Sequence, residues 1–146
     1  MAFYCELTDV IGTGVSEQNL IDMTNDGEAT AVDQDVFDAC RVSATSMIDS
    51  FAAVLYSEEI PFTPVPPSLV TIAAQLTKYF LYSRNDAVSE AMETVYEQQM
   101  SILKLLAAGK FRITGVSGNK VKKDTILFSK KSPGDRAFAP GKMGGY

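Results

Sequence analysis

The side chains of this chain that could take part in acid–base or metal chemistry are carboxylates, because its 146 residues include no histidine. The chain therefore lacks the usual general base, the commonest metal ligand and the base that activates a serine or cysteine nucleophile. Its acidic residues fall mostly on the polar faces or at the starts of predicted helices. We therefore expect no enzymatic activity.

The best-spaced group of metal ligands lies in the segment DMTNDGEATAVD. Counted as a twelve-residue calcium loop, this segment has Asp22, Asp26 and Asp33 at positions 1, 5 and 12. Thr24 stands at position 3, where a carboxylate or amide is usual, and Asp33 is shorter than the usual glutamate. The segment is thus a partial match to a calcium site. The other interpretation is a helix–helix connection in which Asp33 caps the second helix.

Charge is distributed unevenly along the chain. Residues 1–100 contain three cationic and sixteen acidic side chains, whereas residues 101–146 contain ten cationic and two acidic ones. An acidic body with a basic C-terminal arm favours head-to-tail association, because each arm finds a neighbour's acidic surface. The side chains that we expect at such an interface are Lys122, Lys123, Phe128, Lys130, Lys131, Arg136, Phe138, Met143 and Tyr146.

The hydrophobic periodicity predicts helices over most of the first 109 residues. Two short helices are expected near Leu7–Ile11 and after the cap residue Ser16. Apolar residues at spacings of three and four then predict a helix at about residues 33–57, which ends before the proline-rich PFTPVPP. A further helix opens at Pro66–Pro67 and ends near Arg84. The last one is capped by Asn85 and Asp86, and Gly109 terminates it.

After Gly109 the period changes from helical to alternating. Residues 110–114 and 125–129 are expected to form a hairpin, or two strands offered to a neighbour. The density of proline and glycine in residues 129–146 excludes helix there. We therefore predict a mainly α fold, a small bundle of about four to five helices (residues 1–109), with an extended, partly β, basic C-terminal arm (residues 110–146).

Cysteine content and hydropathy limit the cellular setting. Cys5 and Cys40 fit neither a disulfide framework nor a zinc-binding spacing. The N-terminal residues do not resemble a signal peptide, and no apolar stretch approaches the ~20 residues that span a bilayer. We therefore expect synthesis in a reducing cytoplasm and no membrane association.

Several segments together resemble the head–tail connector family of tailed bacteriophages and Mu-like prophages. They are MAFYCELTDVI, Asp49 in a helix that closes on FAAVLY, PFTPVPPSLVTIAAQLTKYFLYSR, LLAAGKFRI, and an ending in which Arg136 and Phe138 precede Met143, two glycines and Tyr146. The resemblance covers nearly the whole chain and departs from the family pattern at residues 115–131.

The resemblance implies a structural role in the virion neck. Such connectors are helical adaptors that form a ring, typically of twelve subunits, beneath the portal protein. The ring joins the head to a stopper or tail protein, and genomic DNA passes through its centre without sequence-specific binding. The protein would be made in the bacterial host cytoplasm and would need no cofactor.

Three other interpretations remain open from the sequence. A stopper or tail-terminator ring would be another structural role, although those proteins are commonly β-rich. A small cytosolic helical protein could bind nucleic acid through the basic arm, where Phe128 and Phe138 lie among the lysines as in single-strand binders. A calcium-dependent helix pair is the third.

Overall fold

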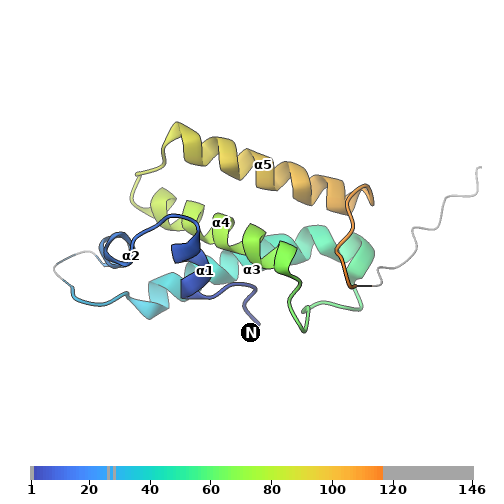
Figure 1. Cartoon of the computed structure of the whole chain (residues 1–146), viewed down its shortest axis with the longest axis horizontal. Helices are drawn as coiled ribbons and strands as arrows, with labels where there is room; N and C mark the ends of the chain where they lie inside the picture. The colour runs from blue at the N-terminus through green and yellow to red at the C-terminus, as the bar shows by residue number, and fades with distance from the viewer. Residues whose placement is uncertain (1, 26, 28, 117–146) are drawn as a thin grey trace, which may run out of the picture.

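The structure, a computed structural model, describes residues 2–25, 27 and 29–116. These residues are mainly helical and none of them lies in a strand, which confirms the predicted helical bundle (Figure 1). The part of the fold prediction that concerns residues 117–146 lies outside the described residues. In order, the described helices are α1 (Leu7–Gly12), α2 (Glu17–Thr24), α3 (Gln34–Tyr56), α4 (Pro67–Arg84) and α5 (Glu90–Ala107).

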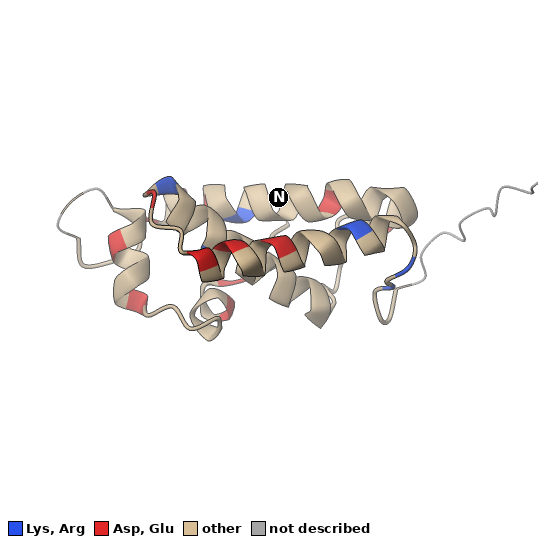
Figure 2. Ribbon diagram, turned by 90° about the horizontal axis from the view of Figure 1, so that it is seen from above, with Lys and Arg blue, Asp and Glu red and all other residues tan. Residues whose placement is uncertain are grey.

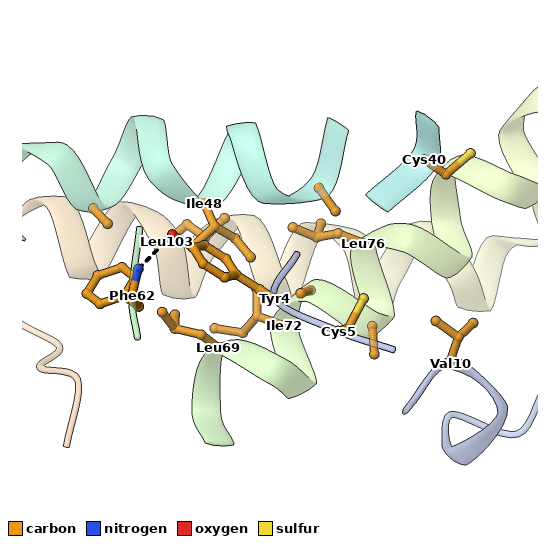
Figure 3. Close-up of a cluster of buried hydrophobic side chains, with 14 of the residues drawn as sticks. Tyr4, Cys5, Val10, Cys40, Ile48, Phe62, Leu69, Ile72, Leu76 and Leu103 are labelled. Carbon is orange, nitrogen blue, oxygen red and sulfur yellow. Dashed lines mark hydrogen bonds between the residues drawn. The ribbon is translucent and has the colours of Figure 1, made fainter. Parts of the chain in front are cut away.

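The core lies where α3, α4 and α5 pack against one another, while α1 packs against α4 and α2 contacts both α3 and α4. Each long helix buries one apolar stripe, as the three-and-four spacing predicts. Figure 3 shows members of this cluster converging from different helices, among them Ile48 of α3, Leu76 of α4 and Leu103 of α5. Each of these fully buried side chains contributes roughly 1.5–3 kcal/mol by leaving water.

Helix starts follow local capping signals. Ser16 accepts a hydrogen bond from the amide of Asn19 at 3.1 Å, as expected for the cap of α2. Pro66 and Pro67 open α4, where a missing amide hydrogen costs nothing. The expectation for α5 is wrong. The residue that caps α5 is Ser89, which accepts from the amide of Met92, rather than Asn85 or Asp86.

The chain leaves α5 through a tight turn at Gly109, whose positive φ of 71° is open to glycine without strain. This turn directs the amides of Lys110 and Phe111 back to the carbonyl of Leu105, at 2.9 and 3.1 Å. Because those donors are already used by the end of the helix, residues 110–114 do not form the expected strand in the described part of the chain. Ile113 instead enters the core, with 2% of its surface exposed.

No helix among the described residues combines the length and hydropathy that crossing a bilayer requires.

Candidate functional site

The nine predicted interface side chains lie outside the described residues, so their contacts stay predictions. They are Lys122, Lys123, Phe128, Lys130, Lys131, Arg136, Phe138, Met143 and Tyr146. A functional surface in the described chain therefore has to be found in the helical body and in residues 110–116, which lead into the arm.

The segment that partly matches a calcium loop has the geometry of a helix connection where it is described. One carboxylate oxygen of Asp33 accepts the amides of Asp35 and Val36 at 3.0 and 3.2 Å, which caps α3. Asp22 lies on α2 and accepts from Gln18 at 3.1 Å. Asp26 lies outside the described residues. Within residues 2–25, 27 and 29–116, no group of three acidic or cysteine side chains could hold a metal ion.

A second acidic side chain, Asp49, belongs to a buried hydrogen-bond chain. The Tyr4 hydroxyl donates to Asp49 of α3 at 2.5 Å and accepts from the amide of Phe62 at 3.3 Å. Figure 3 shows the Tyr4 hydroxyl directed at that amide. Burial raises the pKa of Tyr4 well above its usual value, and the hydrogen bond to Asp49 raises it further. Tyr4 is thus a neutral structural link between the N-terminus, α3 and the segment before α4.

The buried cation of the body, Arg41, is also used structurally. With 6% of its surface exposed, it donates to the carbonyl of Cys5 and to the carboxylate of Glu6, each at 3.2 Å. Arg41 also forms an ion pair with Asp38, and this pairing lowers the pKa of the Asp38 carboxyl. The Arg41 guanidinium lies 3.9 Å from the centre of the Phe3 ring. These contacts attach the N-terminal segment to α3, and they leave no converging acid and base in a cavity.

An open groove of about 660 Å³ lies on the surface of the described residues. We call it the proline groove. Its two walls are far apart in the sequence. One is the connection from α3 to α4 and the other is the segment that follows α5, and the two segments lie at the same end of the molecule in Figure 1. The lining residues are 58–59, 61–67 and 114–116.

Both walls of the proline groove are anchored to the core. The hydroxyl of Tyr56 accepts the amide of Ile113 at 3.2 Å, which joins the end of α3 to the segment after α5. The ring of Phe62 packs between Tyr4 and Tyr56, with centroids 5.8 and 6.0 Å away. These contacts attach each wall of the groove to the packed helices.

The chemistry of the proline groove is apolar with an acidic rim. Prolines and valines supply half of the lining residues, and Glu58 and Glu59 supply two carboxylates. One oxygen of Glu59, Oε2, is buried and has no hydrogen-bond partner among the described residues. A buried acceptor without a donor is uncommon because it has lost water without replacement. The groove thus combines apolar side chains with two carboxylates, one of which has an unpaired oxygen among the described residues.

A smaller hollow of about 210 Å³ lies between α4 and α5 and is lined by Lys78, Tyr79, Met92 and Val95 among others. Beside it the rings of Tyr79 and Tyr96 stack at 4.1 Å. No acid–base pair converges in it. Along the neighbouring exposed side of α5, acidic side chains recur at helical spacing, as Figure 2 shows. They are Glu90, Glu93 and Glu97.

Sequence reasoning missed the proline groove because its two walls are about fifty residues apart in the chain. From the sequence, the run PFTPVPP indicates the end of one helix and the start of the next, together with the resemblance to the connector family. The sequence feature that could have indicated the groove is the position of this run just after Glu58 and Glu59. Prolines beside adjacent carboxylates can form an apolar surface patch with a charged edge.

Comparison with known families gives one result. The model of the family described as "Bacteriophage Mu, Gp36" matches residues 4–127. The match covers all five described helices and residues 110–127 of the basic arm, which include part of the stretch that departs from the connector pattern. A search of curated proteins finds no match.

Proposed function

The chain belongs to the bacteriophage Mu Gp36 family, and from this membership we propose that it is a head–tail connector of the virion neck. The family identifies a Mu-like phage protein with a structural or assembly role. The finer proposal is a homo-oligomeric ring, expected to have twelve subunits, between the portal protein and a stopper or tail protein. The viral genome passes through its lumen.

The observation that carries this proposal is the division of the chain into an acidic helical body and a basic arm. Among residues 1–100 the acidic side chains outnumber the cationic ones by thirteen, and among residues 101–146 the cationic ones exceed the acidic by eight. A negative wall around a channel repels the phosphate backbone, so DNA can move past it without being held. The arm has the opposite charge and is suited to a protein surface.

Ring closure needs a contact between two different surfaces of the same chain, repeated around the ring. The basic arm supplies one of these surfaces. Its cations can pair with carboxylates, while Phe138, Met143 and Tyr146 are apolar anchors for a neighbouring subunit or for the portal. Arg136 is expected to pair with a carboxylate of the partner.

The role that we propose is structural and involves no catalysis. The groups whose pKa shifts are resolved, Tyr4, Cys5, Asp38 and Cys40, are buried or paired with structural partners. This supports a body built for packing.

Deletion of residues 132–146 tests the proposal. We expect heads filled with DNA but without tails, and loss of the ring on purified portals, as seen by negative-stain microscopy. The substitutions Phe138→Ala and Tyr146→Ala should reproduce the defect in part, and the matched control Ser132→Ala should not. Full heads with tails attached after the deletion would rule out the role of the arm.

A further inference from the structure

We propose that the proline groove of one copy of this chain receives the basic C-terminal arm of a neighbouring copy. The inference rests on the proposed ring and names the surface that accepts the arm. The receiving residues are Glu58, Glu59 and the apolar residues between Pro61 and Pro67.

Charge complementarity is the first argument. The groove has two adjacent carboxylates and no cationic lining residue. The buried oxygen of Glu59 has no donor in the described chain, so an entering ammonium group would supply the hydrogen bond that is missing. Residues 117–146 contain seven cationic and two acidic side chains, including the pairs Lys122–Lys123 and Lys130–Lys131.

The second argument is the fit between the lining of the groove and the composition of the arm. The proline and valine lining offers apolar contact, and its prolines have no amide hydrogen to donate. An extended segment with apolar residues between lysines can place its cations on the rim and its apolar side chains on the floor. In the arm, Ile126, Leu127 and Phe128 lie between the two lysine pairs.

The third argument concerns reach. The described chain reaches the rim of the groove at Thr114, Gly115 and Val116, and residues 117–146 continue from there. Thirty extended residues span up to about 100 Å, whereas α3, with its 23 residues, is about 35 Å long. The arm is therefore long enough to pass its own body. A groove beside the root of one arm that binds the next arm gives a contact that repeats around a ring.

Charge reversal tests the electrostatic part of the contact in the full chain, with portal protein present where assembly requires it. The double variant Glu58→Lys with Glu59→Lys should weaken self-assembly at least about tenfold. The matched control is Glu17→Lys with Asp22→Lys, which makes the same change of charge on exposed residues of α2, at the other end of the molecule in Figure 1. Equal weakening by both variants would overturn the proposal, because total charge would then account for the effect.

Compensating substitutions establish which lysines enter the groove. Lys122→Glu with Lys123→Glu, or Lys130→Glu with Lys131→Glu, should restore assembly of the Glu58→Lys, Glu59→Lys chain. Rescue by either pair supports the proposal and sets the register of the arm, whereas rescue by neither overturns it. Circular dichroism checks that the groove variants keep their helices, and the milder Glu58→Gln, Glu59→Gln chain replaces them if they do not fold.

Disulfide trapping separates a neighbour's arm from the chain's own. Both native cysteines are buried, so a thiol introduced at the groove reacts selectively. Full-length Glu58→Cys chains are mixed with differently tagged Lys122→Cys or Lys130→Cys chains and allowed to assemble. A linked heterodimer is expected. A link that forms only within one chain carrying both cysteines, or no link in an assembled sample, would reject the groove as the neighbour's docking site.

Light scattering on the same samples measures the mass of the assembly. This mass shows whether a negative result rejects the groove alone or also the connector role. A ring that forms without the cross-link rejects the groove and leaves the connector role standing. A chain that stays monomeric at every concentration, with portal present, rejects the proposed function and the groove together.

Discussion

Tyr4 illustrates how single side chains hold this fold together. Its hydroxyl donates to Asp49 and accepts from the amide of Phe62, so three segments far apart in the sequence meet at one atom. The ring is buried beside Phe62, which itself contacts Tyr56. Losing the hydroxyl would leave a buried amide and a carboxylate without their partner.

Substitution of Tyr4 by phenylalanine should therefore lower the free energy of unfolding by about 1–3 kcal/mol. The control is Tyr82→Phe, because the Tyr82 side chain is only partly buried. Urea denaturation followed by circular dichroism measures both variants. Equal stabilities of Tyr4→Phe and the parent chain would show that this hydrogen-bond chain contributes nothing.

Alkaline pH should destabilise the fold through its buried acids. Burial raises the pKa values of Cys5, Cys40 and Tyr4, so the folded state keeps protons that the unfolded state releases. The contribution of these three groups to the free energy of unfolding is fully present below the ordinary pKa values, which are about 8.5 for a thiol and about 10 for a phenol. It is lost as the pH rises above them.

Urea midpoints measured between pH 8 and 11 under reducing conditions should accordingly fall. The Cys40→Ala chain should show a shallower fall than the parent, because one of the three groups is removed. Midpoints that stayed constant or rose across this range would contradict the assigned burial.

At the level of helices, single capping or turn residues at the ends set the boundaries. Asp33 caps α3 and Ser89 caps α5, while Gly109 allows the turn that ends α5. Asp33 is the most informative of the three, because the sequence assigned it either to a calcium loop or to a helix cap. The two roles respond differently to replacement of the carboxylate by an amide.

Asp33→Asn should keep nearly all of the stability, since asparagine caps helices as well as aspartate does, whereas Asp33→Ala should lose about 1 kcal/mol. Thermal unfolding of the two variants measures the difference. Calorimetric titration of the parent chain with calcium should give no binding heat. Heat that disappears in Asp33→Asn would instead support the calcium loop.

On the scale of the whole molecule, the helical body includes residues beyond its last helix. Ile113 is buried in the core and its amide donates to Tyr56, so residues 110–116 pack on the bundle before the chain reaches the arm. The partly buried Phe111 and Val116 also contact the core. This packing positions one wall of the proline groove.

Ile113→Ala should therefore destabilise the whole body by about 2–4 kcal/mol, as expected for a large side chain removed from a core. The adjacent and exposed Arg112 supplies the control, and Arg112→Ala should change stability by no more than about 0.5 kcal/mol. A single shifted unfolding transition is expected for Ile113→Ala. Unchanged global stability would mean that residues 110–116 are not part of the cooperative unit.

Local patterns were sufficient to predict most of the helical body. The stripe from Val36 to Leu55 predicted α3 to within one residue at each end, because helix periodicity depends on neighbours three and four positions apart. The same holds for α4, which begins at its prolines. Charge segregation and the lack of histidine are likewise properties of the linear chain.

Contacts between distant segments could not be derived in this way. The amides of Lys110 and Phe111 bond to the end of α5, and Ile113 bonds to Tyr56, so the alternating pattern after Gly109 does not become a strand in the described chain. The proline groove arises for the same reason, since Glu59 and Val116 line one groove only when α5 packs on α3. Periodicity reports which face of a segment is apolar, but the partner that covers that face is chosen by packing in three dimensions.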